Sequence, residues 1–344
     1  MNKYDTINTI SYMGNKSKLL DFIIPEIKKI TKKGNIICDL FGGTNAIGYA
    51  LKKDYTIYTN DAMTFSFIIS KAIIENNNKA INKNSAKNFI KPKYEYNMMN
   101  KEHTFFYEKY KNKYFSEEQC LQIDSIRSSI SNMTDIYEKA LYLTALLNTV
   151  SRCQTTYGNF THTIKENIEK KERLYEKDIW KEFLSNCNLY DDIIKSNYSN
   201  KSFNKDYKNL LLTKEFENVS CVYIDPPYSK EQYSRFYHVL EDLINYDNSN
   251  LKDQTKNNID RFISNFSIKN KVKDEFIYLI STLSSQNKKV VLSYTTHGLL
   301  NNLELEEIFT KYYKHVSILG TKVIHSSFGS KPYELEELLY IAYN

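Results

Sequence analysis

The chain has 344 residues, with 47 Lys and Arg against 41 Asp and Glu, which gives a formal net charge of +6. This length can bury a full hydrophobic core without a disulfide or metal staple, and the mild positive charge is compatible with a polyanionic partner without requiring one. The sequence contains no apolar stretch of about 18 residues and no amino-terminal basic region followed by an apolar core. We therefore expect a soluble, cytoplasmic protein that is not exported and does not bind a membrane.

The cysteines and histidines exclude two kinds of chemistry. The five cysteines are odd in number and form no Cys-x-x-Cys pair, so reduced intracellular thiols are expected. None follows a proline, which removes the Pro-Cys nucleophile that methylation of cytosine C5 would need. The six histidines lack metal-ligand spacing such as His-x-x-x-His, and we expect no metal.

The amino-terminal part has the pattern of a parallel α/β sheet. Residues 12–20 place a glycine turn and a lysine ahead of an apolar helical run. A short apolar strand, 35–40, then runs into a glycine turn, followed by a helix at 46–53 and a second strand at 55–60. Strand, turn, helix and strand in this order predict the opening of a parallel sheet.

The middle of the chain is predicted to be helical. Helical periodicity is clear at 116–129 and 135–150, and no convincing strand occurs between residues 81 and 201. The Asn- and Lys-rich stretches 75–93 and 246–258 are expected to be surface connections. We predict a mainly helical insertion at 81–201 within an α/β core formed by 1–80 and 202–344.

The last block returns to α/β. Its predicted strands and helices are, in chain order, strand 220–224, helices 232–244 and 274–283, strand 289–294 and helix 303–312. Two final runs, 316–324 and 337–343, are close enough to pair as a hairpin. A mostly parallel, seven-stranded sheet with an antiparallel last strand resembles the methyltransferase variant of the Rossmann fold, rather than the all-parallel dinucleotide-binding form.

The most informative segment is the strand 221–224, which runs directly into Asp225, Pro226, Pro227 and Tyr228. Ligands in open α/β sheets bind at the carboxyl ends of strands. The prolines fix φ and remove two backbone donors, so the loop offers acceptors and suits a ligand that donates from an amine. The alternative is an ordinary strand-ending turn, because Asp and Pro are common turn formers.

A second segment is the turn after the first strand, made of Asp39, Leu40, Phe41, Gly42, Gly43, Thr44 and Asn45. Its glycines let the backbone approach a ligand closely, but they do not form the Gly-x-Gly-x-x-Gly pattern of dinucleotide binding. The carboxylate of Asp39 disfavours an anion and favours a cationic ligand such as the amino-acid and sulfonium end of S-adenosylmethionine. Asp61, after the next strand, stands where an acid accepts hydrogen bonds from ribose hydroxyls. The alternative is a purely structural turn.

Four segments in order, 12–16 (Tyr-Met-Gly-Asn-Lys), 39–44 (Asp-Leu-Phe-Gly-Gly-Thr), 60–61 (Asn-Asp) and 225–228 (Asp-Pro-Pro-Tyr), resemble the motifs of the Dam-like class of DNA adenine-N6 methyltransferases. The similarity extends through Gln232-Tyr233, Tyr237-His238, Glu241 and residues 291–294, and there it resembles the branch found in restriction-modification systems with asymmetric sites. It covers both α/β blocks and leaves the helical middle largely unmatched, as expected if that region reads the target sequence.

The resemblance implies S-adenosylmethionine as cofactor. It implies that Tyr12 and Lys16 hold the cofactor's methionine end or its adenine, that Asp61 holds its ribose and that Asp206-Tyr207 contact its adenine. Asn45 departs from the family, which often has a small residue or glycine there. The full predicted cofactor set is Tyr12, Gly14, Asn15, Lys16, Asp39, Leu40, Phe41, Gly42, Gly43, Thr44, Asn45, Asp61, Ala62, Asp206, Tyr207 and Asp225.

The resemblance also implies a mechanism. The N6 amine of an extruded adenine would donate to Asp225 and to the carbonyl of Pro226, while Tyr228 stacks on the base, and the methyl would pass directly from sulfur to nitrogen. An enzyme acting on cytosine N4 usually has Ser where this chain has Asp225, so adenine is favoured. The alternatives are an N4-cytosine or RNA methyltransferase, a non-catalytic DNA-binding module and a nicotinamide-dependent oxidoreductase.

Contacts with double-stranded DNA are predicted in three places. Lys109 and Lys113 lie among aromatic residues at 105–115, where the alternative is an amphipathic helix with its lysines in water. The polar loop 151–159 and the segment after the Pro-Pro loop supply the remaining candidates, namely Arg152, Gln154, Tyr157, Asn159, Lys230, Gln232, Tyr233, Arg235 and His238. A nucleoid-associated monomer or weak dimer with a cognate restriction endonuclease is the expected setting.

Overall fold

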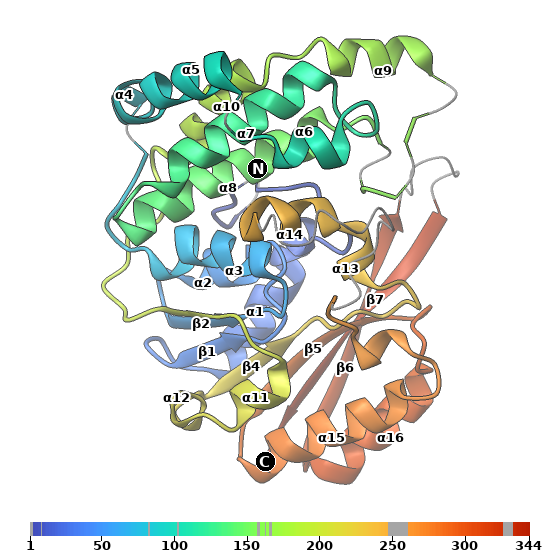
Figure 1. Cartoon of the computed structure of the whole chain (residues 1–344). Coiled ribbons are helices and arrows are strands. Elements are labelled where there is room, and N and C mark those ends of the chain that lie inside the picture. Colours follow the sequence, from blue (N-terminus) through green and yellow to red (C-terminus); the bar gives the residue numbers. More distant parts are fainter. Residues whose placement is uncertain are drawn as a thin grey trace.

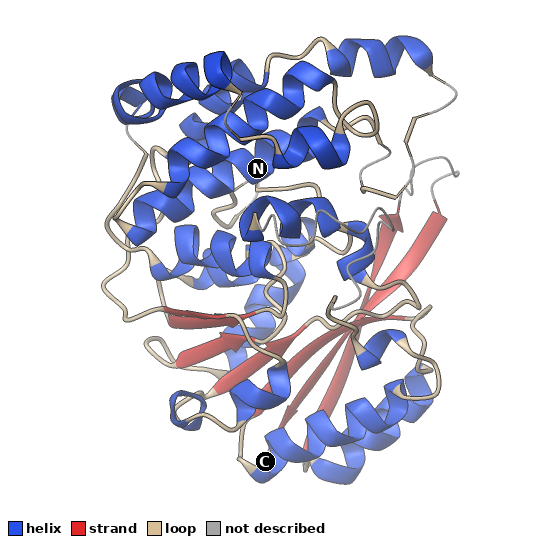
Figure 2. Ribbon diagram, in the orientation of Figure 1, coloured by secondary structure: helices blue, strands red, loops and turns tan. Residues whose placement is uncertain are grey.

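The computed structural model describes residues 3–7, 9–81, 83–101, 103–156, 159–161, 163–164, 167–246, 261–325 and 333–344. Within them, a seven-stranded sheet has the order β3-β2-β1-β4-β5-β7-β6 and is covered by helices (Figures 1 and 2). Its strands are β1 (Ile36–Asp39), β2 (Thr56–Asn60), β3 (Lys201–Phe203), β4 (Cys221–Ile224), β5 (Lys289–Thr295), β6 (His315–His325) and β7 (Tyr333–Tyr343).

The direction of the strands confirms the predicted fold class. Strands β1 to β5 pair with one another only in parallel, whereas β7 lies between β5 and β6 and is antiparallel to both. The predicted hairpin is formed by β6 and β7, which pair from His315 with Tyr343 to His325 with Tyr333. The sheet is therefore the mostly parallel, Rossmann-like form with an antiparallel last strand.

Helices cover the sheet on two sides, and alternate residues of each central strand point to opposite sides. Ile37 and Tyr223 belong to a core cluster with α1, α2, α3 and α14, whereas Cys38 and Val222 belong to a second cluster with α11, α15 and α16. The helices of the α/β core are α1 (Leu20–Ile30), α2 (Ala46–Leu51), α3 (Thr64–Ser70), α11 (Tyr207–Leu211), α12 (Lys214–Glu217), α13 (Tyr233–Phe236), α14 (His238–Asn245), α15 (Val272–Ser285) and α16 (Asn302–Tyr312).

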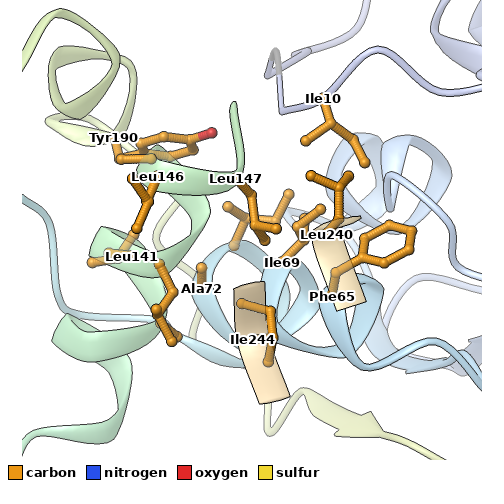
Figure 3. Close-up of a cluster of buried hydrophobic side chains, with 14 of the residues drawn as sticks. Ile10, Phe65, Ile69, Ala72, Leu141, Leu146, Leu147, Tyr190, Leu240 and Ile244 are labelled. Atoms are coloured by element: carbon orange, nitrogen blue, oxygen red, sulfur yellow. The ribbon is translucent and has the colours of Figure 1, made fainter. Parts of the chain in front are cut away.

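The middle of the chain forms a helical layer above α3 and α14 (Figure 1). Its helices are α4 (Lys83–Ser85), α5 (Lys91–Asn100), α6 (Phe105–Tyr110), α7 (Glu117–Ser131), α8 (Ile136–Cys153), α9 (Ile168–Tyr175) and α10 (Ile179–Cys187). Figure 3 shows Leu141, Leu146 and Leu147 of α8 near Ile69 of α3 and Ile244 of α14, and all five are buried. The helical layer and the α/β core thus share one hydrophobic cluster.

Three expectations about local structure were wrong. The single helix expected at 232–244 is broken at Tyr237, which has φ −116° and ψ 18° and caps both α13 and α14. The stretch 75–93 is not only a connection, because α4, a π-helical segment at 86–90 and the start of α5 occupy 83–93 and bury Ala86 and Ile90. The edge strand β3 was missed, because it has only three residues and all are half-buried.

The described residues contain no helix that is both long and apolar enough to cross a bilayer. Across the same ranges, no group of three or more His, Cys, Asp or Glu side chains is arranged to hold a metal ion. All five cysteines are buried and free.

Candidate functional site

A cleft opens where the carboxyl ends of β1 and β4 lie side by side. From these two adjacent strands the chain proceeds outward in opposite directions, to β2 and β3 on one side and to β5 on the other. Ligands of open α/β sheets bind at such switch points. Asp39 ends β1 and Asp225 follows β4, and both line a cavity of about 1130 Å³, which includes open solvent at its mouth.

The glycine turn on one wall of the cleft is held by a buried asparagine. Asn45 has φ +61°, a left-handed conformation that Asn tolerates better than most residues, and its side chain is fully buried. Its Oδ1 accepts a hydrogen bond from Thr59 Oγ1 at 2.6 Å, and its Nδ2 donates to the carbonyls of Gly43 and Ser66 at 3.3 and 3.4 Å. A Cβ on Gly42 would lie 2.7 Å from Asn45 Oδ1, so the buried amide requires glycine there. Asn45 therefore supports the turn from beneath and does not line the cleft.

Two carboxylates at the strand ends give this wall its charge. Asp61 accepts the Gly43 amide on Oδ2 at 2.9 Å and the Met63 amide on Oδ1 at 2.8 Å, which ties the turn to the end of β2. Asp39 is buried, and its Oδ1 has no hydrogen-bond partner. Burial, together with the charges of Asp225 and Asp61, raises the pKa of Asp39 to about 8. A buried carboxyl in this state is a site for a positively charged group.

The opposite wall contains a lysine between two carboxylates. Lys16 Nζ lies 3.1 Å from Asp225 Oδ1 and 3.0 Å from Glu337 Oε1, and the hydroxyl of Ser293 donates a short hydrogen bond to the same Glu337 oxygen. Burial raises the pKa of Asp225 to about 6; Lys16 opposes this rise and Glu337 adds to it. Burial alone would lower the pKa of Lys16, but the two carboxylates raise it above its ordinary value.

Aromatic rings lie close to the Pro-Pro loop. Tyr12 stacks on Tyr233 and Tyr237, with ring centroids 5.4 and 4.8 Å away, and the Met13 amide donates to the hydroxyl of Tyr237 at 2.8 Å. The break between α13 and α14 thus places the Tyr237 ring against the segment before α1. Tyr228 lies close by, with the Lys16 ammonium 5.9 Å from its ring centroid.

The far end of the cleft is apolar and leads to a buried acid. Phe41, Tyr207 and Phe266 contact one another, with centroid separations of 5.5 to 5.7 Å. The hydroxyl of Tyr207 donates to Glu275 Oε1 at 2.8 Å, and Asp206 caps α11 through the amide of Lys208. These rings are tilted by 44 to 89° to one another and form an apolar wall that suits an aromatic group of a ligand.

Most of the predicted cofactor and catalytic residues come together in this cleft. Those that line it are Tyr12, Gly14, Asn15, Lys16, Asp39, Phe41, Gly42, Gly43, Thr44, Asp61, Ala62, Asp206, Tyr207, Asp225 and Pro227. Leu40 does not, because its side chain is buried in the second core cluster. Pro226 is buried and Tyr228 is half-buried beside the cleft, near Gly14.

The residues predicted to bind DNA have varied surroundings. Lys230, Arg235 and Arg152 are exposed. Lys109 is also exposed and pairs with Asp242 of α14 at 2.6 Å, whereas Lys113 lies 4.5 Å from the ring centroid of Tyr114.

Several of these side chains are engaged within the protein. Gln154 is buried, donates to the Ser151 carbonyl and accepts from Thr156. Asn159 accepts from Thr161, and Tyr157 lies outside the described residues. Gln232 and Tyr233 line the cleft, where Gln232 exchanges two hydrogen bonds with the backbone of Ser264.

Three regions predicted to contact DNA nevertheless lie together. The Thr155 amide donates to the Tyr114 carbonyl, the Tyr114 hydroxyl to the Phe160 carbonyl, and the Phe160 amide to the Phe236 carbonyl, at 2.7 to 3.0 Å. His238 lies between these regions, about 6 Å from the rings of Tyr114 and Phe160, and burial lowers its pKa. The loop after α8, the segment around α6 and helix α13 are therefore held together by hydrogen bonds beside the cleft, which Tyr233 of α13 lines.

Several residues at or beside the cleft were not foreseen from the sequence. Among those that line it are Glu275, a buried acid on α15, and the exposed apolar residues Phe262 and Ile263. Glu337 on β7 is a buried acid that contacts Lys16 of the cleft. A buried acid within an apolar strand pattern, as in Leu335-Glu-Glu337-Leu-Leu339, was the available indication for Glu337.

The fold and the site together define a class of protein. A mostly parallel sheet with β7 inserted antiparallel, a glycine turn after β1 and an Asp-Pro-Pro-Tyr loop after β4 on the same cleft are features of Rossmann-like methyltransferases. Residues 12–308 match the family described as D12 class N6 adenine-specific DNA methyltransferase. The chain belongs to this family, which confirms the resemblance to adenine methyltransferases.

The chain is similar to curated proteins named as modification methylases and type II methyltransferases. The chain is 31% identical over 315 residues to Modification methylase LlaI of Lactococcus lactis subsp. lactis, and 31% identical over 324 residues to Type II methyltransferase M.FokI of Planomicrobium okeanokoites. Each match covers 88% of this chain but only 48% and 47% of those proteins, so the chain spans about half of their length. It is 24% identical to Type II methyltransferase M2.HphI of Haemophilus parahaemolyticus, where 99% of this chain matches 98% of that protein.

Proposed function

We propose that the chain is an S-adenosylmethionine-dependent methyltransferase that modifies N6 of adenine in double-stranded DNA. One observation carries the proposal: Asp225 of the Pro-Pro loop and the Gly42-Gly43 turn line a single cleft. A cofactor held by the turn and a base held by the loop would then meet, as direct transfer between them requires.

The residues of the cleft fit this cofactor. Asp39 offers a buried oxygen without a partner, which suits the positively charged amino-acid end. Gly43 has φ +51°, and a Cβ there would lie 3.0 Å from the Tyr12 ring, so the turn leaves room only for backbone. The apolar wall of Phe41 and Tyr207 suits the adenine ring. A nicotinamide dinucleotide fits less well, because its phosphates would face Asp39 and Asp61.

In the proposed mechanism, bound S-adenosylmethionine supplies a methyl group on an electrophilic sulfonium. Asp61, which lines the cleft and accepts the amides of Gly43 and Met63, would hold the ribose hydroxyls. Asp225 and the carbonyl of Pro226 would each accept a hydrogen bond from one N–H group of the target amine. These two hydrogen bonds would turn the lone pair of the amine nitrogen towards the methyl group. The extra proton leaves the nitrogen after the carbon–nitrogen bond has formed and the carbon–sulfur bond has broken, so no strong general base is needed.

We assign DNA recognition to the helical region 81–201 together with the surface formed by the loop after α8, the α6 segment and α13. The exposed cations Arg152, Lys230 and Arg235 belong to these segments or adjoin them in the chain, and they suit phosphate contacts. The target adenine must leave the duplex to reach Asp225. We further propose that the protein is a monomer or weak dimer in the cytoplasm, associated with the nucleoid, and that it acts with a cognate restriction endonuclease. The names of its relatives, a modification methylase and a type II methyltransferase, support the restriction-modification setting.

Mass spectrometry of nucleosides tests the proposal directly. Unmethylated duplex DNA and RNA are incubated separately with the protein and the cofactor and then digested. We expect N6-methyladenine from DNA alone. Three outcomes would refute the proposed activity. N4-methylcytosine would favour a cytosine-N4 methyltransferase, modified RNA would favour an RNA methyltransferase, and tight DNA binding without methyl transfer would favour a non-catalytic DNA-binding module.

Asp225→Ala is the matched variant. It should reduce transfer at least about 100-fold, the scale expected when a positioned electrostatic contact to the reacting group is lost. Circular dichroism and calorimetry should show an intact fold and largely retained cofactor binding. Near-normal turnover by Asp225→Ala would contradict the role given to this carboxylate.

A further inference from the structure

Glu337 is a charged residue on an apolar strand face. Side chains alternate along β7, so Glu337 shares its face with Leu339 and Ile341, which are buried in the core cluster that also contains Tyr223. The side chain of Glu337 is itself only 7% exposed. A buried carboxylate is tolerated only when it is paired and hydrogen-bonded, so its partners indicate why it is there.

Glu337 has two partners, and one of them, Lys16, lines the cleft. On β5, the hydroxyl of Ser293 donates to Glu337 Oε1, and the pairing of Thr295 with Glu337 fixes the position of the carboxylate along the sheet. The same oxygen lies 3.0 Å from Lys16 Nζ, and that ammonium is 3.1 Å from Asp225 Oδ1. One buried cation is therefore shared between two carboxylates, and the group carries a net negative charge.

We propose that Glu337 is a positioning residue that shares Lys16 with Asp225 and so keeps the ammonium from closing onto the catalytic carboxylate alone. The inference rests on the proposed function, in which Asp225 accepts a hydrogen bond from the target amine. An ammonium paired with Asp225 alone would compete with the target amine for the lone pairs of the Asp225 carboxylate. The shared ammonium still offsets the charge of Asp225 but weakens that carboxylate less as a hydrogen-bond acceptor.

The position of Glu337 makes this role independent of the known motifs. The residues that match the family end at 308, and Glu337 lies beyond them on the antiparallel strand. Strand β7 thus adds a contact to Lys16, a residue of the cleft, in addition to its place in the sheet. Ser293, at the carboxyl-terminal half of β5, belongs to the same arrangement.

The proposal predicts the direction in which the pKa of Asp225 changes when a neighbouring charge is removed. The charged and titratable groups around Asp225 come from five segments. They are Tyr12 and Lys16 before α1, Glu337 on β7, Asp39 at the end of β1, Tyr223 on β4 and Tyr233 on α13. Removing the negative charge of Glu337 takes away repulsion and should lower the pKa of Asp225. Removing the positive charge of Lys16 takes away attraction and should raise it. A purely structural role for Glu337 predicts no such opposite shifts.

The experiment is a carboxyl-carbon NMR titration of the full chain labelled with ¹³C-carboxyl aspartate, in which the Asp225 signal is the one absent from Asp225→Asn. We expect its midpoint to fall by about one pH unit in Glu337→Gln, to rise in Lys16→Met and to stay near the wild-type value in Glu337→Asp, which keeps the charge. If Glu337→Gln does not fold, Glu337→Met suits the apolar face and carries the same expectation. An unchanged or raised midpoint in the uncharged variant overturns the proposal.

Turnover measured against pH gives the second readout. In Glu337→Gln the acid limb of kcat should move to lower pH, and kcat should fall about tenfold with little change in the KM for DNA. The two hypotheses fail separately. Shifted midpoints in a wild-type protein that does not methylate DNA would refute the proposed function but leave the shared lysine intact. Full methylation with unshifted midpoints would refute only the role of Glu337.

Discussion

Replacement of Asn45 by Ala tests whether the cofactor turn depends on a single buried amide. Asn45 combines three features at one position: a left-handed backbone with φ +61°, complete burial, and hydrogen bonds that join the turn to Thr59 of β2 and Ser66 of α3. If this side chain holds the turn in place, its loss should weaken both the fold and cofactor binding.

The expected magnitude follows from these contacts. Asn45→Ala leaves the buried Thr59 hydroxyl without the acceptor that it meets at 2.6 Å, and a stranded buried polar group costs about 1–3 kcal/mol. Alanine in the left-handed region adds about 1 kcal/mol. The free energy of unfolding should therefore fall by about 2–4 kcal/mol, a large part of the roughly 5–15 kcal/mol typical of folded proteins.

Urea unfolding measures this loss, followed by circular dichroism and by the fluorescence of the single tryptophan, Trp180 of α10. Asn45→Gly is the matched control, because it loses the same hydrogen bonds without strain at positive φ. We expect the Gly variant to be more stable than the Ala variant by about 1 kcal/mol, the reverse of the usual order in helices. Equal stability of the two variants, or an Ala variant within about 0.5 kcal/mol of wild type, would refute the reasoning.

Two further predictions concern charge. The pKa of Asp39 is about 8 in the folded protein and about 3.9 in the unfolded chain. Between these pH values the cofactor-free folded protein binds one more proton than the unfolded chain, so its stability falls as the pH rises from about 4 to 8. Asp39→Asn should remove that loss and be the more stable protein at pH 8, although it binds cofactor poorly; urea unfolding across pH, with no gain in the variant, would disprove this. Arg235→Ala and Lys230→Ala should each lower the slope of log K for DNA binding against log salt by about one, measured by fluorescence anisotropy, and unchanged slopes would remove these residues from the DNA surface.

The parts of the fold that the sequence revealed are those with strong local patterns. Short apolar runs ending in an acid, such as 35–39 and 221–225, gave β1 and β4, and clear helical periodicity gave α7 and α8. The cleft followed because the carboxyl ends of parallel strands share one edge, so that Asp39 and Asp225 had to be near one another. Local pattern and sheet topology were sufficient for these features.

The features that were missed depend on contacts between distant segments. Helix 232–244 breaks at Tyr237, where the ring packs on Tyr12 more than 200 residues earlier in the chain. No local pattern announces that break. Gln154 has the composition of a base-reading residue, but its amide is used within its own loop, because a buried amide must find partners wherever the fold supplies them.

The chemistry of the cleft is set by the same kind of distant contact. The strand ends bring Asp39, Asp61 and Asp225 to one cavity, and burial raises the pKa of each of them. Lys16 is shared with Glu337, so its charge offsets this excess only in part. Without a bound cation, ionisation of Asp39 is unfavourable. A cation that binds beside Asp39 stabilises the ionised carboxylate, and part of the binding energy comes from this stabilisation. The acids that make the cofactor-free fold less stable above pH 4 are thus the same groups that make the cleft selective for a positively charged ligand.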